Sequence, residues 1–291
     1  MPVDVRPLLP ADVAAADDSA YRSLSEMAAV YEGSPMPERS PERVARGRHR
    51  VAHLQRTDPG GAWVAVDGEQ LVGVALALRR GPLWFLSLLT VATGHQSRGI
   101  GGRLLEASLR TAAGAPAGLI VASADPKALR RYALAGFALH PAYVGTGRTD
   151  RAGLPSGLGV RDGDWATDAD LVEDVVTRLR GVGYGPDLTA MAVHYGQLMV
   201  AEDGPERGFC LRGTQGVQGL GATTPALAQR LLWEGLARGD GEEYLEPLGA
   251  DQPWAVEVAL AARLSLSVPA STCRRGVLGP LTPFLPSGAY G

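Results

Sequence analysis

The stretch Leu86–Leu105 reads LSLLTVATGHQSRGIGGRLL. Its apolar run up to Val91 predicts a buried strand, and the apolar spacing after Gly101 predicts an amphipathic helix. Glycines at a strand-to-helix turn let backbone N–H groups converge on one point, and the helix N-terminus adds unpaired donors and a positive dipole end. Arg98 places a positive charge beside them. The turn therefore suits a phosphate or pyrophosphate.

Two common nucleotide-binding motifs are excluded by their spacing. A Rossmann motif with Gly99 and Gly101 would need glycine at position 104, which is Leu104. A Walker A loop needs lysine after its last glycine, and the single lysine of the chain is Lys127. The phosphate-binding turn thus belongs to another class.

The elements around this turn alternate between helices and strands. Hydrophobic periodicity, turn signals and helix caps predict a strand, two helices, three strands joined as hairpins, and then a helix, strand, helix and strand. Their expected ranges are 3–6, 11–27, 41–55, 62–66, 71–78, 83–91, 101–113, 118–123, 126–135 and from 137 onward. This order indicates an α/β chain with a mixed sheet, not a doubly wound parallel one.

The pattern restarts after residues 145–159, which are rich in Gly, Thr, Ser and Arg and resemble a linker. Val160-Arg161 repeats Val5-Arg6, and 198–204 repeats the pattern of 63–68. Matches in the same order at similar spacing favour a diverged tandem duplication. The alternative is one α/β domain followed by an unrelated C-terminal half.

Over Val3 to Arg148 the chain resembles the GNAT superfamily of N-acetyltransferases. The resemblance rests on Gln96-Ser-Arg-Gly-Ile-Gly101, on Tyr132-Ala-Leu-Ala-Gly-Phe137, and on the order of the elements. It implies two GNAT-like domains, each a mostly antiparallel sheet with helices on both faces. Residues 1–150 would form the catalytic domain, and residues 151–291 a degenerate copy that packs on it and walls the acceptor pocket.

The resemblance also implies acetyl-CoA as co-substrate. Its pyrophosphate would lie on the backbone amides of the glycine-rich turn, its pantetheine arm would pair with the preceding strand, and Asp125 stands where many relatives have asparagine. The implied cofactor-binding residues are Leu89, Thr90, Val91, Gln96, Ser97, Arg98, Gly99, Ile100, Gly101, Gly102 and Asp125. Because the chain has no asparagine, Asp125 is also explained by composition.

Tyr132 matches the tyrosine that is the usual general acid of the family. The alternative is a core residue, because Tyr132 shares a helical stripe with Leu129 and Ala133. The expected chemistry is direct attack of an amine on the thioester. Residues 84–91 carry no carboxylate to act as base, so Glu26, Glu32 and the carboxylate of Gly291 are the candidates. With Glu38, the two glutamates would favour a cationic amine.

The second half lacks the corresponding residues. Thr223–Ala228 replaces the phosphate turn and contains Pro225, which has no N–H, but no glycine. Ala259 stands where Tyr132 stands in the first half. We therefore expect one acetyl-CoA per chain.

Charge and composition limit the partners. The 291 residues include 28 Lys and Arg against 31 Asp and Glu, so no overall basic field favours nucleic acid. The longest mainly apolar run, residues 83–92, falls short of the ~20 residues of a membrane span, and the first residues do not resemble a secretory signal. Cys210 and Cys273 are too few for a disulfide framework or a zinc site. The sequence predicts a cytoplasmic protein.

His49 and His53 do not form a metal motif, because Arg50 occupies the place of the glutamate in His-Glu-x-x-His. We expect both at the surface and no metal. The favoured function is acetyl-CoA-dependent acetylation of a small-molecule amine, in a monomer or a homodimer. The alternative is a non-catalytic acyl-CoA sensor or interaction module.

Overall fold

The computed structural model describes residues 3–31, 33, 35–277 and 279–291. The first half contains β1 (Asp4–Pro7), α1 (Val13–Tyr31), α2 (Pro41–Thr57), β2 (Ala62–Asp67), β3 (Gln70–Arg80), β4 (Leu83–Val91), α3 (Ile100–Leu109), β5 (Ala117–Ser123), α4 (Pro126–Leu134) and β6 (Ala138–Gly147). The second half contains β7 (Val160–Asp162), α5 (Ala169–Arg180), α6 (Asp187–His194), β8 (Gln197–Asp203), β9 (Glu206–Gly213), β10 (Gly216–Ala222), α7 (Pro225–Ala237), β11 (Glu243–Gly249), α8 (Pro253–Ala261), β12 (Ser265–Gly276) and β13 (Phe284–Leu285).

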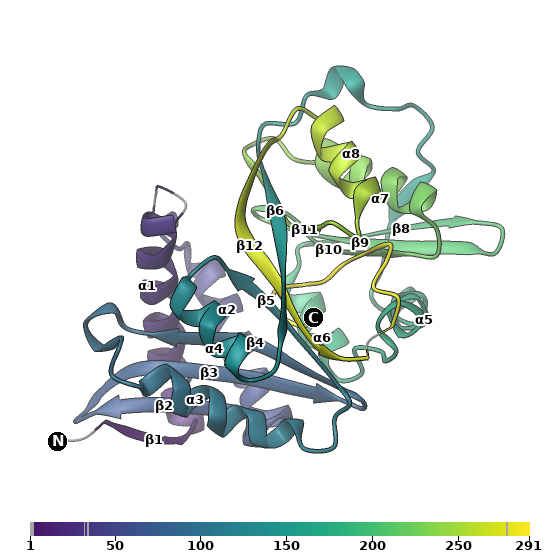
Figure 1. Cartoon of the computed structure of the whole chain (residues 1–291). Coiled ribbons are helices and arrows are strands. Elements are labelled where there is room, and N and C mark those ends of the chain that lie inside the picture. Colours follow the sequence, from purple (N-terminus) through teal and green to yellow (C-terminus); the bar gives the residue numbers. More distant parts are fainter. Residues whose placement is uncertain (1–2, 32, 34, 278) are drawn as a thin grey trace.

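The mixed α/β fold predicted from the sequence is confirmed. The described strands form an eight-stranded sheet in the order β1-β2-β3-β4-β5-β12-β6-β11 and a five-stranded sheet in the order β13-β10-β9-β8-β7. Every ladder is antiparallel except the one between β4 and β5. Apolar side chains of α1 and α2 pack with one face of the first sheet, and those of α3 and α4 with the other (Figure 1).

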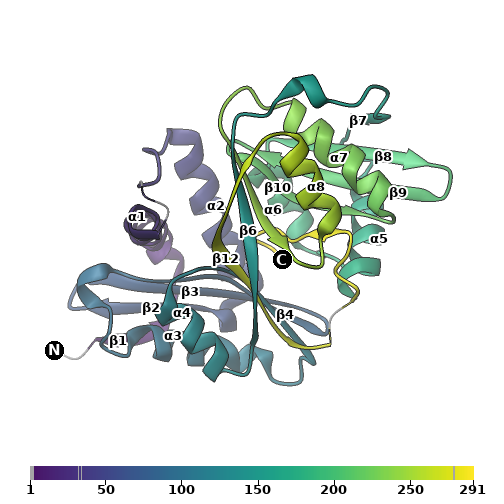
Figure 2. The same ribbon diagram turned by 45° about the horizontal axis from the view of Figure 1, so that its top comes forward.

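Two strands of the second half complete the sheet of the first. β12 lies between β5 and β6, and β11 pairs with the far edge of β6. Figures 1 and 2 both show β6 and β12 side by side, running between the two bodies of the molecule. Alternating apolar residues predict a strand but not its neighbours, so this exchange was not predictable from local patterns. The expected division at residue 150 remains a prediction, and the sheet crosses it.

The last strand fills the edge of the second sheet that faces β11. Leu285 and Phe284 of β13 pair with Leu220 and Gly221 of β10, and β13 also contacts β11. Both β13 side chains are fully buried.

A buried ionic network joins the halves. Asp187 at the start of α6 accepts hydrogen bonds from His53 Nε2 at 2.8 Å and Arg80 Nε at 2.8 Å, and Arg80 also contacts Asp58. His53 is 2% exposed, so its expected surface position is wrong. The cause is the packing of α2 against α6. Within the described ranges, the structure has no helix with the length and apolarity of a transmembrane segment.

Candidate active site

A bulge in β4 creates the central feature of the site. Leu86 is opposite Ala77 and Leu88 is opposite Leu76, so Ser87 is the extra residue. The bulge inverts the side-chain alternation: Phe85 and Leu88 pack on the α1 and α2 side, whereas Leu86 and Leu89 pack on the α3 and α4 side. The parallel ladder with β5 ends at Leu86. Beyond it, the edge of β4 at Leu89–Val91 has a ladder only with β3.

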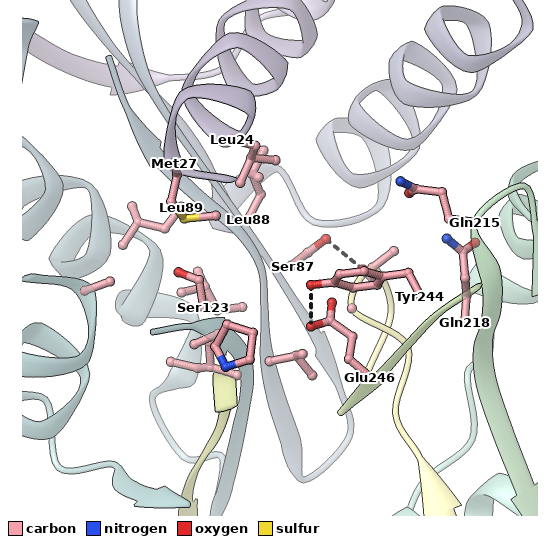
Figure 3. A pocket seen from close by; sticks show the side chains of 18 of the residues that line it. Leu24, Met27, Ser87, Leu88, Leu89, Ser123, Gln215, Gln218, Tyr244 and Glu246 are labelled. Carbon is pink, nitrogen blue, oxygen red and sulfur yellow. Dashed lines mark hydrogen bonds between the residues drawn. The ribbon is translucent and has the colours of Figure 1, made fainter. Parts of the chain in front are cut away.

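The separation of the two strands opens into a cavity of about 350 Å³, here called the reaction cavity. Both halves of the chain line it, and Figure 3 shows the leucines of α1 and β4 opposite polar side chains of the second half. Its lining includes Leu24, Met27, Leu88, Leu89, Ser123, Tyr132, Gln215, Gln218, Tyr244 and Glu246. The leucines and Met27 thus form an apolar wall from the first half, and Gln215, Gln218, Tyr244 and Glu246 form a polar wall from the second half.

The glycine-rich turn presents unused backbone donors. Ser97 has a φ of +62° and Gly99, the N-cap of α3, has a φ of +78°. This left-handed geometry turns successive N–H groups toward one side of the chain. Among the described residues, no hydrogen bond occupies the N–H groups of Ser97, Arg98 or Gly99. By contrast, the N–H groups of Gln96 and Gly102 donate to Thr93 and Gly99 within the turn.

A small cavity of about 50 Å³ lies against this turn and is here called the loop cavity. Thr90, Val91, Gln96, Ser97 and Gly101 line it. It shares Leu89, Asp125 and Ala128 with the reaction cavity, so the turn connects with the open edge of β4.

Two cations beside the turn were missed at the sequence level. Lys127 Nζ lies 3.1 Å from Gln96 Oε1, and a Cβ added at Gly101 would lie 3.2 Å from the Arg131 guanidinium. Both side chains line the loop cavity. Their spacing of four residues on α4 puts them on one helix face and was the available signal. Arg98 belongs to the turn itself, so three cationic residues lie in or beside it, together with the Asp125 carboxylate.

Tyr132 lies on α4 and lines the reaction cavity. It is 5% exposed and packs in a cluster with Trp84, Leu86 and Cys273. Burial raises the pKa of its hydroxyl well above the ordinary value of 10, so the phenol is protonated at neutral pH. Tyr132 therefore combines a core position with a place at the cavity wall.

Asp125 caps α4, and its carboxylate accepts from the Lys127 N–H at 2.9 Å and from the Tyr31 hydroxyl at 3.3 Å. It lines both cavities. Its hydrogen bonds give it a structural role at the helix start, whatever else it contacts.

Two of the base candidates from the sequence, Glu26 and Gly291, are not among the residues that line the reaction cavity. The Glu26 carboxylate accepts from the Thr93 hydroxyl, and the Gly291 oxygen accepts from Arg180 Nη1 at 2.9 Å. Glu32 lies outside the described residues. The cavity is instead lined by Glu246, whose Oε2 accepts from the Tyr244 hydroxyl at 3.3 Å. Glu246 comes from β11, and only the strand exchange brings it here.

The turn before α7, which the repeated sequence pattern aligns with the glycine-rich turn, has its threonine side chains hydrogen-bonded within the second half. The Thr224 hydroxyl caps α7 by accepting from the Leu227 N–H, and Thr223 exchanges hydrogen bonds with Arg207. Ala259 is fully buried. The Ala222 N–H donates to Pro283, immediately before β13. No free edge comparable to Leu89–Val91 adjoins this turn in the described part of the chain.

Comparison with known proteins agrees with this geometry. Residues 24–137 match the model of the acetyltransferase (GNAT) family. By structure, the chain is similar to a Pyrococcus horikoshii protein assigned to the acetyltransferases, with a TM-score of 0.75 and 17% identity over 99% of this chain and 96% of that one. A sequence search of curated proteins gives no match.

Two GCN5-related N-acetyltransferases share the fold over 94% of this chain. The Sphaerobacter thermophilus protein is matched over 95% of its length, with 17% identity and a TM-score of 0.57. The Kribbella flavida protein is matched over 72% of its length, with 18% identity and a TM-score of 0.54. The family match at residues 24–137 and the open β4 edge beside a donor-rich turn thus both point to an acetyltransferase (GNAT) domain in the first half of the chain.

Proposed function

We propose that the protein transfers an acetyl group from acetyl-CoA to a primary amine of a small molecule by direct attack. One observation carries the proposal: the unused N–H groups of the turn connect, through adjoining cavities, with the free edge of β4 and with Tyr132. This arrangement suits a long ligand with phosphates at one end and a reactive group at the other.

The residues fit acetyl-CoA at both ends. Convergent N–H donors, Arg98, Lys127 and Arg131 suit a pyrophosphate. The β4 edge at Leu89–Val91 has backbone groups outside any ladder with β5 and suits the amides of the pantetheine arm. When bound, the co-substrate supplies an activated thioester carbonyl, whose oxygen a β4 N–H would stabilise as charge develops.

Proton transfer is assigned to two side chains. As the amine nitrogen bonds to the carbonyl carbon and the carbon–sulfur bond breaks, Glu246 takes the amine proton, directly or through water. Tyr132 gives its proton to the departing sulfur. Burial keeps the phenol protonated before the reaction, so its proton is available where the thiolate forms. The two groups come from different halves of the chain, so both halves contribute to the reaction cavity.

Residues 151–291 are proposed to be a diverged GNAT-like copy that binds no cofactor. The support is the repeated order of elements, the capped turn at Thr223–Ala228, and the β13 segment beside β10. This half walls the acceptor side through Gln215, Gln218 and Tyr244.

The test is release of free thiol from acetyl-CoA by the full chain, with a panel of polyamines, amino acids, aminosugars and arylamines. We expect release that depends on the amine, with the acetylated amine detected by mass spectrometry. Gly101→Glu is the inactive control. Acetyl-CoA binding without amine-dependent release would contradict the proposal and favour a non-catalytic acyl-CoA sensor.

A further inference from the structure

A third cavity, of about 250 Å³, lies between α1 and α2 and is here called the arginine cavity. It shares six residues with the reaction cavity: Leu24, Arg50, Leu88, His194, Gln215 and Gln218. It shares none with the loop cavity. The three cavities therefore form a series, with the phosphate-binding turn at one end and the arginine cavity at the other. An acceptor that reaches the reaction cavity can extend into the arginine cavity without meeting the cofactor's phosphates.

Three guanidinium groups of α2 line this cavity. Arg43, Arg46 and Arg50 are spaced three and four residues apart, so they share one helix face. Among the described residues, neither Arg43 nor Arg46 has an ion pair or a side-chain hydrogen bond. Arg50 donates only to the Ser87 hydroxyl and carbonyl oxygens, at 2.6–3.2 Å, which are neutral acceptors.

The acidic groups nearby offset these charges only in part, because Asp17 attracts Arg50 and Glu42 attracts Arg46 without forming an ion pair with either. Asp17 lines the same cavity, but Arg39 pairs with it and also contacts Asp18 at 2.7 Å. Glu42 lies on α2 but is exposed and does not line the cavity. The cavity thus has an excess of positive charge.

The positive charge of the cavity also affects the pKa of His194, which lines it. Burial, together with the charges of Arg50, Arg46 and His49, lowers the pKa of His194 to about 3. His194 is therefore neutral at physiological pH, and it adds no charge to the cavity that it lines. A partner of opposite charge would relieve the repulsion among the three guanidinium groups.

We propose that the arginine cavity binds an oxyanionic group of the acceptor, a carboxylate or a phosphate, so that the substrate is an amine with an anionic end. The inference rests on the proposed function and specifies its substrate class. Guanidinium groups bind both oxyanions through paired N–H donors, and Gln215 and Gln218 add neutral donors. The expectation of a cationic amine rested on Glu26, Glu32 and Glu38. Glu26 and Glu38 line none of the three cavities.

The test uses the full chain saturated with CoA, so that the phosphate turn is occupied. Inorganic phosphate and sodium acetate are titrated separately at constant ionic strength, and the rise in melting temperature gives the half-saturating concentration. We expect one or both anions to stabilise the wild type. In Arg46→Gln and Arg43→Gln, the half-saturating concentration of the anion should rise by about tenfold or more. The matched control is Arg48→Gln, which changes an exposed arginine of α2 outside the cavity and should behave as wild type.

A kinetic arm compares O-phosphoethanolamine with ethanolamine and 4-aminobutanoate with butylamine. We expect a higher kcat/KM for the anionic member of a pair and a rise in its KM of about tenfold in Arg46→Gln, with kcat retained. Stabilisation by neither anion, or equal stabilisation of wild type and Arg46→Gln, would overturn the inference. Acetyl-CoA binding, measured by calorimetry for each variant, separates this failure from failure of the proposed function.

Discussion

At the scale of single residues, Tyr132 and Glu246 divide the proposed proton transfers. The tyrosine was identified from its spacing to Gly136 and Phe137, which a short motif preserves. Glu246 could not be found that way, because it reaches the cavity through a strand that follows Tyr132 by more than a hundred residues. The roles of Arg46 and Arg50 were not predictable from the sequence either, because no local pattern shows that their helix face adjoins the acceptor side of the cavity.

Replacing Tyr132 by Phe keeps the buried ring and removes the hydroxyl. We expect kcat to fall by about 10²–10⁴-fold, because general acid catalysis is worth that much, with the Kd of acetyl-CoA nearly unchanged. Steady-state kinetics and calorimetry measure the two quantities. An unchanged kcat, with chemistry shown to limit turnover, would leave Tyr132 as a core residue only.

Replacing Glu246 by Gln should lower kcat/KM for the amine by about 10²-fold at neutral pH. The deficit should shrink at alkaline pH, where more of the free amine is already neutral. Glu242→Gln, on the exposed turn before β11, is the matched control and should have normal kinetics. A deficit that stays constant across the pH range would point to a structural role for Glu246.

At the scale of elements, the bulge at Ser87 and the turn after β4 define the proposed cofactor site. The bounds of β4 are those expected from the sequence, whereas the bulge is not visible in its apolar run, because both faces of the strand are buried. The turn was predictable because its glycines serve a local geometry. Gly99 needs its left-handed φ, and Gly101 has the Arg131 guanidinium against it.

Gly101→Glu tests the turn. The added side chain brings bulk and negative charge to the place where the pyrophosphate must approach the backbone, so acetyl-CoA binding should be lost in calorimetry. Gly241→Glu adds the same side chain at a position with open space and should bind normally. Unchanged affinity in folded Gly101→Glu would show that the cofactor's phosphates lie elsewhere.

At the scale of the whole molecule, the halves are joined by exchanged strands and by the network around Asp187. Element types and their order were predictable along most of the chain, because periodicity is local. The neighbours of β12 were not, since pairing across the sheet depends on both halves. The buried position of His53 followed from the same packing.

Asp187→Ala should lower the free energy of unfolding by about 3–5 kcal/mol, because it leaves Arg80 and His53 buried with one partner fewer. Denaturant unfolding measures the change. Asp174→Ala removes an exposed carboxylate paired with Arg207 and should cost less than about 1 kcal/mol. Equal, small losses in both variants would show that the network does not hold the halves together.

The central claim is that one half of the chain binds the co-substrate and the other closes its equivalent slot with its own residues. Calorimetric titration of the full chain with acetyl-CoA tests this most directly. The account predicts one site per chain, absent in Gly101→Glu. A stoichiometry of two per chain, or binding retained by that variant, would contradict it.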